Sequence, residues 1–169
     1  MLERPNRVRY RDLARVHTQE YLESLSQPRT LARIFAADET ELQVDEVLKT
    51  IRFACGATVQ AARSRLVHGG IALNLFGGFH HAAPDSAGGF CAVNDIAVAT
   101  AVLRNEGFRG RIVVIDVDAH PPDGLAACFR GDSSVWVGSI SGESWGPLEG
   151  VDETVLPRGS EDRTYLCAL

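Results

Sequence analysis

Apolar residues recur every three or four positions between Val44 and Val67, a stagger that predicts one long amphipathic helix. Gly69 and Gly70 interrupt the pattern and mark the end of that helix. Residues 10–25 show a similar spacing over a shorter stretch, and Pro28 follows as a stop signal. The first part of the chain therefore predicts one or two short helices followed by a long one.

Short, continuous apolar runs alternate with further helical stretches in the rest of the chain. Each run is bounded by glycine, proline or polar residues, which is typical of a buried strand. We expect strands at 71–76, 111–118, 134–140 and 153–156, and helices at 95–103, capped by Asn94 or Asp95, and at 123–129. Alternating strands and helices predict an α/β fold, a three-layer doubly wound parallel sheet, in one domain over residues 1–169.

Polar side chains follow two of these apolar runs. Asp116, Asp118 and His120 occupy alternate positions after one run, and an extended strand would point all three the same way. His80 and His81 follow another run, and the ends of parallel strands share one edge of a sheet. Unpaired buried carboxylates are costly, so we expect a divalent metal among them. Imidazole and carboxylate together suit zinc and iron.

Each of these groups also has an ordinary structural explanation. The carboxylates could cap the following turn by accepting backbone N–H groups, and the histidine pair could be satisfied within its loop. The glycine pairs 77–78 and 88–89 could be plain turn residues, or could let the backbone pass close to a ligand. The coincidence of five polar side chains at two strand ends favours the metal site.

Two nucleophile motifs deserve comparison with the metal hypothesis. Residues 142–146 match the G-x-S-x-G pattern of serine hydrolases, but Pro147 stands where a helix should begin. No histidine follows His120, although that hydrolase order places the histidine last. Cys91 could act with one histidine of the pair, yet a lone cysteine is more often a buried thiol.

Composition excludes several classes of protein. The net charge of −5 and the lack of a basic run argue against a nucleic-acid binder that works by bulk electrostatics. The four cysteines form no C-x-x-C pair, which indicates neither a zinc knuckle nor a disulfide framework. No signal peptide and no apolar stretch of about 18 residues is present, so we expect a cytoplasmic protein without a membrane partner.

Several short motifs resemble the histone deacetylase family in order and spacing, over nearly the whole chain. Among them, Asp-Ala-His and the run at 88–92 are most similar to class IV and bacterial deacetylase-like members. The motifs are Gly-Gly-Phe-His-His-Ala at 77–82, Gly-Phe-Cys at 89–91, Asn-Asp-Ile-Ala at 94–97, Asp-x-Asp-x-His at 116–120 and the run at 16–22.

The resemblance implies an arginase/deacetylase-like α/β fold and a metal-dependent amide hydrolase. The implied substrates are acetylated lysine peptides or acetylated small amines. Asp118 and His120 fall on the family's zinc ligands, and Fe²⁺ would also suit such a site. Zinc polarises the acyl oxygen and acidifies water, which an imidazole can then deprotonate.

The resemblance also assigns roles to other residues. His80 and His81 match the family's tandem catalytic histidines, with Asp116 and Asp123 as their carboxylate partners. Such a carboxylate fixes the tautomer and the basicity of its histidine. The acyl channel would be lined by Phe90, Phe79 and Gly89. A structural K⁺ would lie near Asp116, Asp118, His120 and Ser139, and a second one near Phe129 and Val135.

Two departures from the family pattern suggest a partial copy of its domain. Pro121 and Pro122 replace residues with backbone N–H donors directly after the ligand histidine, which stiffens the turn. A third ligand Asp and a transition-state Tyr lie further downstream in the family, and Tyr165 is in the wrong place to be that tyrosine. The sequence therefore leaves three readings open. They are an active deacylase, an inactive fragment that serves as an interaction module, and an enzyme whose third ligand comes from elsewhere.

The source of a third ligand stays open at this point. It could be another subunit, since a truncated parallel sheet would expose an apolar edge through which a homo-oligomer could form. It could also be one of four acidic residues of this chain, namely Asp132, Glu143, Glu149 or Asp152.

Overall fold

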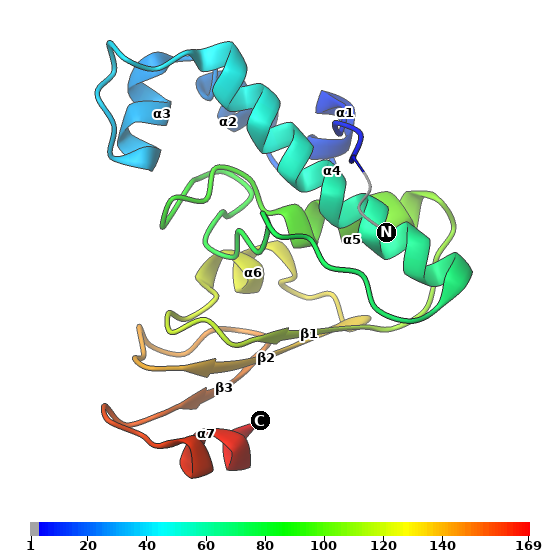
Figure 1. Ribbon diagram of the computed structural model, residues 1–169, viewed down its shortest axis with the longest axis vertical. Helices are drawn as coiled ribbons and strands as arrows, with labels where there is room; N and C mark the ends of the chain where they lie inside the picture. Colours follow the sequence, from blue (N-terminus) through cyan, green and yellow to red (C-terminus); the bar gives the residue numbers. More distant parts are fainter. Residues whose placement is uncertain (1–3) are drawn as a thin grey trace.

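The computed structural model describes residues 4–169 and has a layered arrangement, with helices above a small sheet (Figure 1). None of the helices in residues 4–169 is both long and apolar enough to cross a membrane. In chain order the elements are α1 (Tyr10–Leu13), α2 (Gln19–Ser24), α3 (Pro28–Phe35), α4 (Val44–His68), α5 (Asp95–Asn105), β1 (Ile112–Asp116), α6 (Asp123–Cys128), β2 (Val135–Ser141), β3 (Val151–Val155) and α7 (Asp162–Ala168).

The long helix expected from the apolar stagger is confirmed as α4. Its first turn carries Asp45 and Glu46 and its last turn carries Arg65 and His68, which suits the helix dipole at both ends. The apolar positions of α4 face α5, which also lies where the sequence predicts it. Asn94 caps α5 by accepting the Ala97 N–H at 3.0 Å.

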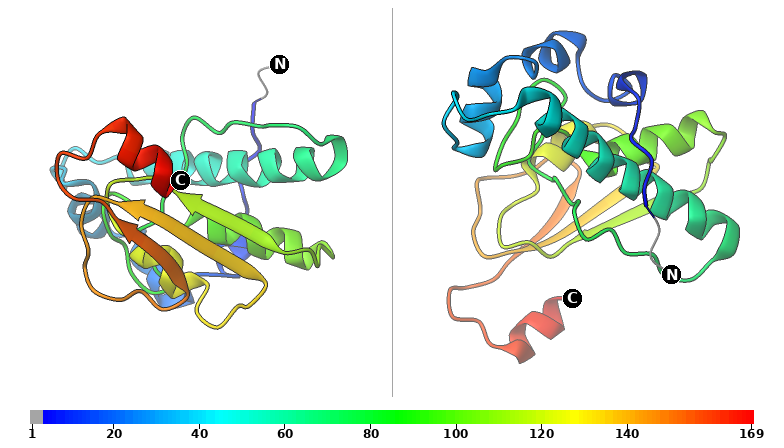
Figure 2. Two further views of the ribbon diagram at one scale, coloured as in Figure 1. Left: turned by 90° about the horizontal axis from the view of Figure 1, so that it is seen from below. Right: turned by 45° about the horizontal axis from the view of Figure 1, so that its top comes forward.

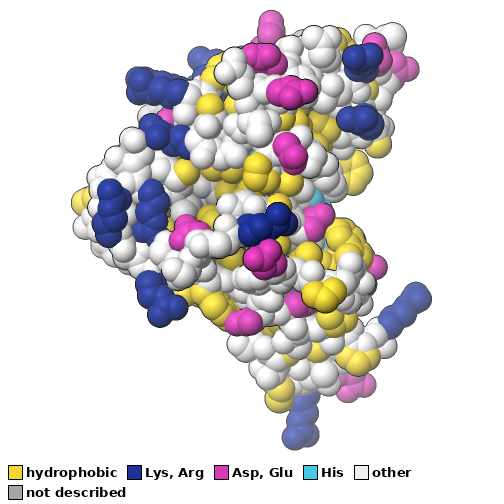
Figure 3. Space-filling view, turned by 180° about the vertical axis from the view of Figure 1, so that it is seen from behind, with side chains coloured by type: hydrophobic (Ala, Val, Ile, Leu, Met, Phe, Trp, Pro, Cys, Tyr) yellow, Lys and Arg dark blue, Asp and Glu magenta, His cyan; other side chains and the backbone are white. Residues whose placement is uncertain are grey.

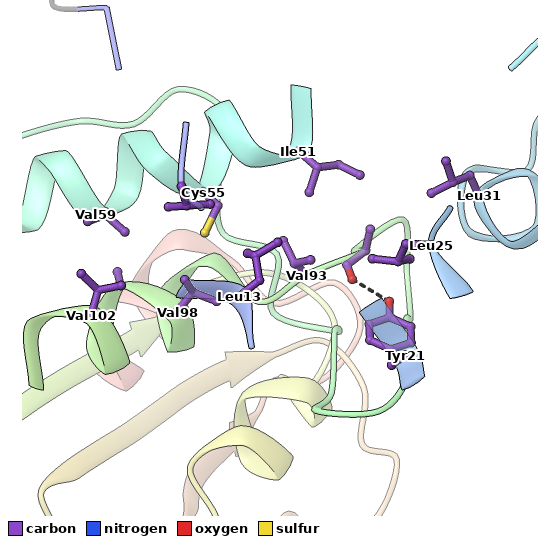
Figure 4. Close-up of a cluster of buried hydrophobic side chains, with 13 residues drawn as sticks. Leu13, Tyr21, Leu25, Leu31, Ile51, Cys55, Val59, Val93, Val98 and Val102 are labelled. Atoms are coloured by element: carbon purple, nitrogen blue, oxygen red, sulfur yellow. Dashed lines mark hydrogen bonds between the residues drawn. The ribbon is translucent and has the colours of Figure 1, made fainter. Parts of the chain in front are cut away.

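The main core joins these two helices to the short N-terminal helices (Figure 4). Leucines from α1–α3 reach inward toward the same cluster, so the first part of the chain is tied to the rest by apolar burial. Tyr21 places its hydroxyl inside this cluster and donates to the Ala92 carbonyl at 2.6 Å. The labelled members in Figure 4 are Leu13, Tyr21, Leu25, Leu31, Ile51, Cys55, Val59, Val93, Val98 and Val102.

The sheet has three parallel strands in the order β1-β2-β3. Its register pairs Ile112 with Val135 and Asp116 with Ser139. A second core cluster fills the space between the sheet and α6, where Val114, Val137 and Leu125 meet. The expected α/β class with a parallel sheet is therefore confirmed, although β1 ends at Asp116, before Asp118.

The opposite face of the sheet is largely uncovered. Figure 2 (left) shows the strands from this side, with α7 on the same side but not packed on the strands, whereas α4, α5 and α6 lie on the other side. Val113, Ile115 and Val117 are exposed, as is Trp136 of β2. The layer on this face is thus incomplete within residues 4–169.

One sequence prediction about an element is wrong. Residues 71–76 form an exposed loop rather than a buried strand, with Ile71, Leu73 and Leu75 being 86%, 81% and 89% exposed. An apolar run becomes a strand only if a neighbour takes up its backbone hydrogen bonds, and no described strand lies beside it. The helix before Pro28 ends at Ser24, as expected, and a further short helix, α3, begins at Pro28, because a proline at the first helical position needs no N–H partner.

Candidate active site

The candidate site lies in a notch between the helical layers and the sheet. Figure 3 shows this notch at the right of the view, with a histidine visible in it and hydrophobic side chains around it. Its parts come from the loop between α4 and α5, from the carboxyl end of β1 and from the start of α6. Parallel α/β sheets carry their ligand sites at this end of the strands.

His80 is buried and bonded to a buried carboxylate. Its Nδ1 lies 2.7 Å from Asp116 Oδ2, and its Nε2 lies 3.7 Å from Asp118 Oδ1. Burial by itself lowers the pKa of His80, but the hydrogen bond to Asp116 and the charges of Asp116, Asp118 and Asp123 outweigh it, so the pKa is raised. His80 is therefore disposed to carry a proton.

His81 makes the equivalent pair with a more exposed carboxylate. Its Nδ1 lies 2.6 Å from Asp123 Oδ1, so the proton of the neutral ring sits on Nδ1 and Nε2 keeps a free lone pair. The two imidazole rings lie side by side, with centroids 4.0 Å apart. The structure thus brings His80 to Asp116 and His81 to Asp123, as the resemblance implies.

Gly124 lets α6 approach the histidine loop closely. A Cβ at Gly124 would lie 2.5 Å from the His80 carbonyl oxygen and 2.4 Å from the His81 carbonyl carbon. The next residue, Leu125, donates its N–H to the His80 carbonyl at 2.9 Å. Only glycine fits here, which explains why Asp123 can reach His81 from the start of a helix.

Asp95 holds the loop in front of the histidines. Its buried carboxylate accepts the N–H groups of Gly78 and Phe79, the latter at 2.7 Å, and the Thr58 hydroxyl at 2.5 Å. Its neighbour Asn94 donates its side-chain amide to the Ala82 carbonyl at 3.1 Å. From the sequence we predicted a helix cap at one of these residues and a family motif at 94–97. The structure shows that both residues also fix the ends of the histidine loop.

Asp118 and His120 are adjacent, but they bond to each other. Asp118 Oδ1 accepts the His120 backbone N–H at 2.8 Å and lies 2.9 Å from His120 Nδ1. Burial tends to raise the pKa of Asp118, but these hydrogen bonds and the charges of His80 and His120 lower it overall. Asp116 likewise accepts the Asp118 N–H. Both carboxylates therefore accept backbone N–H groups of the following turn, as the structural explanation predicted.

The donor set fits a metal only in part. Within residues 4–169 no three His, Cys, Asp or Glu side chains converge as metal ligands, whereas a catalytic zinc normally takes three protein ligands. The four acidic residues considered as a third ligand do not complete such a group. Asp132 bonds to Ser134, Glu149 pairs with Arg130, and Asp152 accepts the indole N–H of Trp136.

Ser139 presents a buried oxygen without a partner. It lies opposite Asp116 in the sheet register, and its Oγ makes no hydrogen bond to any described residue. A buried hydroxyl without a hydrogen-bond partner is uncommon, and an oxygen of this kind is suited to bind a cation. Phe129 and Val135, assigned to a second cation, place their side chains in the sheet core.

Phe90, Phe79 and Gly89 line an apolar cavity of about 670 Å³ beside the histidines. Gly89 has φ +44°, and a Cβ there would lie 2.1 Å from Cδ2 of His81. Phe90 follows with φ +62°, a left-handed conformation that is uncommon outside glycine and directs its side chain into solvent. Gly89 thus separates this cavity from the ring of His81, which does not itself line the cavity.

Trp145 is a site residue that sequence reasoning missed. It stacks on His81 and lies 6.2 Å, centroid to centroid, from His120. The G-x-S-x-G match drew attention to Ser144, yet an exposed aromatic between glycines after a strand end was the available signal. Cys91, the alternative nucleophile, is buried, and burial raises its pKa to about 11, which keeps the thiol protonated.

Comparison with known proteins identifies the family. The histone deacetylase domain matches residues 1–159. An uncharacterized protein from Picosynechococcus is 38% identical over 116 residues, covering 67% of this chain and 38% of that protein. Histone deacetylase 2 of Arabidopsis thaliana is 36% identical over 133 residues, covering 75% of this chain and 34% of that protein.

A solved structure agrees with the sequence relatives. The crystal structure of an HDAC homolog complexed with SAHA superimposes with a TM-score of 0.77 and 28% identity, over 96% of this chain and 50% of that one. The chain thus has the arginase/deacetylase fold in partial form and spans half the length of this structure and less of the curated relatives. On these grounds the chain belongs to the histone deacetylase family of hydrolases.

Proposed function

We propose that the domain to which this chain belongs is a zinc-dependent hydrolase of N-acyl amides, acting on acetylated lysine side chains or acetylated small amines. The observation that carries this proposal is the pair of adjacent histidines, each bonded to its own carboxylate at 2.7 and 2.6 Å. Two oriented imidazoles supply a proton-transfer group and a positive charge within one site, and amide hydrolysis uses both.

The two histidines have different roles in this reaction. His81 uses its free Nε2 to take a proton from the attacking water and later delivers a proton to the departing amine. His80, whose pKa is raised, stays protonated and stabilises the negative charge that develops on the acyl oxygen. The oxygen of water first bonds to the acyl carbon, and the carbon–nitrogen bond then breaks as the nitrogen takes up the proton, so the products are a carboxylic acid and a free amine.

Asp118 and His120 would hold the zinc ion together with a third ligand from outside the described residues. When bound, zinc would polarise the acyl carbonyl and acidify the attacking water. Support comes from the closeness of the two donors and from the lowered pKa of Asp118, which keeps its carboxylate ionised for a cation. A K⁺ ion near Ser139 and Asp116 is part of the same proposal, because the Ser139 hydroxyl lacks a partner.

The acyl group would enter between Phe90 and the histidines. The cavity beside Gly89 is mostly apolar, which suits the aliphatic part of an acylated lysine or amine. Trp145 would form the opposite wall, since it stacks on His81.

An inactive interaction module is the second candidate. It rests on the sequence pattern, in which only two of the family's three metal ligands are matched, and the relatives of this chain do not favour it over the hydrolase. The two candidates differ in what the chain does with zinc and substrate, so one experiment separates them.

The experiment measures zinc content and turnover of a fluorogenic acetyl-lysine peptide on the metal-depleted and zinc-loaded protein. Deacylase activity should depend on zinc, be inhibited by a chelating hydroxamate and be lost in His81→Ala. His68→Ala, on the exposed end of α4, is the matched control and should change nothing. Turnover without metal would overturn the proposal, and a zinc-free protein without turnover would favour the interaction module.

A further inference from the structure

A second cavity, of about 710 Å³, lies where the N-terminal segment crosses α4. None of its lining residues belongs to the candidate active site. Its lining includes six arginines: Arg7, Arg9, Arg11, Arg15, Arg52 and Arg63. Asp12 and Glu106 are the acidic residues in the lining, so six positive and two negative groups leave a local charge of +4 on a chain of net charge −5. Figure 3 shows Lys and Arg side chains gathered along the side of the molecule opposite the notch.

The N-terminal segment is held against α4 by close backbone contacts. The Val8 N–H donates to the Arg52 carbonyl at 3.1 Å, and Arg52 Nε donates to the Val8 carbonyl at 2.8 Å. Gly56 allows this approach, because a Cβ there would lie 1.8 Å from the Asn6 carbonyl oxygen. The arginines of the segment are thus fixed beside those of the helix.

Two guanidinium groups are positioned by aromatic rings. Arg52 lies 4.4 Å from the centroid of Tyr10, and Arg7 lies 5.5 Å from the centroid of Phe53. Among residues 4–169, the guanidinium groups of Arg7 and Arg11 make no hydrogen bond or ion pair, and the terminal nitrogens of Arg52 make none. The free N–H donors of Arg7 and Arg52 are therefore oriented by aromatic rings, and those of Arg11 are also available to a ligand.

The acidic residues neutralise only part of this charge. Arg15 lies 3.7 Å from Asp12, and Arg63 is paired with Glu106, which raises the pKa of Arg63 and lowers that of Glu106. The remaining like charges repel each other, and a multivalent anion would relieve that repulsion. Guanidinium groups bind phosphate oxygens in bidentate geometry, which favours phosphate over other anions.

We propose that this basic pocket binds a compact polyphosphate group, such as the triphosphate of a nucleotide or an inorganic polyphosphate. A ligand that carries three or four negative charges matches the local excess of positive charge. The volume of about 710 Å³ limits the ligand to a small molecule. A long nucleic acid is disfavoured, because its backbone would extend beyond the pocket over a chain of net charge −5.

Isothermal titration of the chain with sodium tripolyphosphate tests the proposal. We expect one ligand per chain and weaker binding as NaCl is raised from about 50 to about 200 mM. Arg7→Gln/Arg11→Gln should weaken binding by roughly tenfold or more, because two exposed donor groups are removed without disturbing the core. Arg158→Gln/Arg163→Gln removes the same charge from exposed positions outside the pocket and should leave the affinity within about twofold.

Three results would overturn the proposal. The first is no binding of tripolyphosphate at about 1 mM in low salt. The second is an equal loss of affinity in both double variants, which would mean that net charge alone attracts the anion. The third is tighter binding of single-stranded oligonucleotides that grows with their length, which would mean that the surface is a nucleic-acid site. Because the readout is binding, these results do not depend on deacylase activity.

Discussion

The indole ring of Trp145 stacks on the imidazole of His81, with centroids 5.3 Å apart and planes 21° from parallel. His81 is therefore held from two directions, by Asp123 at its Nδ1 and by Trp145 against its face. The carboxylate fixes which nitrogen carries the proton, and the indole limits how the ring can tilt. Such support from neighbouring groups is what keeps a catalytic side chain in a productive geometry.

Replacing Trp145 by alanine should lower kcat/KM for an acetyl-lysine peptide about fivefold, since an aromatic pair contributes roughly 1 kcal/mol beyond its buried area. Trp145→Phe should recover most of the activity, because a flat ring can still cover His81. Trp136→Ala, on the uncovered face of the sheet, is the matched control. Equal activity of Trp145→Ala and the native protein would contradict a role for this ring.

The two histidine partners should differ in their effect on stability. Asp116→Asn and Asp123→Asn should each lower kcat by about 10- to 100-fold, because each weakens the orientation of one imidazole. Asp116→Asn should also lower the free energy of unfolding by about 1–3 kcal/mol, since it leaves buried His80 without its charged partner. Asp123 is partly exposed, so its variant should unfold at nearly native urea concentrations.

Urea unfolding and single-turnover kinetics on the same samples measure both quantities. Equal loss of stability in the two variants would contradict the difference in burial. Unchanged kcat in both would mean that neither carboxylate supports the reaction.

Gly124 should not tolerate even a methyl group. Gly124→Ala would place a Cβ 2.4 Å from the His81 carbonyl carbon and 2.5 Å from the His80 carbonyl oxygen, far inside van der Waals contact, so α6 must move away from the histidine loop. We expect a loss of about 1–3 kcal/mol in unfolding free energy together with loss of activity. Gly142→Ala is the control, because its Cβ would meet the Ala119 carbonyl at an ordinary 3.6 Å. Native stability of Gly124→Ala, measured by thermal unfolding, would contradict this close contact.

Local patterns predicted much of this fold. The spacing of apolar residues in α4 and the cap at Asn94 depend only on residues that are close in sequence, so α4 and α5 could both be predicted. The family resemblance implied the pairs His80–Asp116 and His81–Asp123, and the structure brings the side chains of each pair within hydrogen-bond distance. The loop at 71–76 could not be predicted, because an apolar run does not reveal whether a neighbouring strand exists. The contact between Trp145 and His81 was also hidden, because it joins two loops that are distant in sequence.

The uncovered apolar surface should favour association. Ile71, Leu73 and Leu75 are exposed in the loop after α4, and contact with a second copy of the chain would remove these apolar side chains from water. Ile71→Ser/Leu73→Ser/Leu75→Ser should reduce self-association in sedimentation experiments without lowering the unfolding free energy of the monomer. Leu166→Ser/Leu169→Ser, at the exposed end of the chain, should have a smaller effect. A native protein that stays monomeric at high concentration would contradict the expectation.

The stability of the fold should fall as the pH drops below about 6.5, with His17 as one cause. His17 is buried between the Ala83 carbonyl, which accepts from its Nδ1 at 3.0 Å, and the Asn94 N–H, which donates to its Nε2 at 3.0 Å. Burial lowers the pKa of His17 and outweighs the hydrogen bonds to the Ala83 and Pro84 backbone, which raise it. The unfolded chain therefore binds a proton at a higher pH than the folded one.

The difference between the folded and the unfolded pKa of His17 sets the direction of the stability change and the pH range in which it occurs. The contribution of neutral His17 is complete above the unfolded pKa of about 6.5, and it is lost as the pH falls toward the lowered folded pKa. The slope is at most about 1.4 kcal/mol per pH unit for one proton. His80 acts in the other direction and in another window, because its raised pKa makes its contribution complete below about 6.5 and lost as the pH rises. Urea unfolding from pH 5 to 8 should therefore show a flatter acid limb in His17→Gln, whereas exposed His68→Gln should follow the native curve. Parallel acid limbs in His17→Gln and the native protein would mean that other groups cause the acid loss.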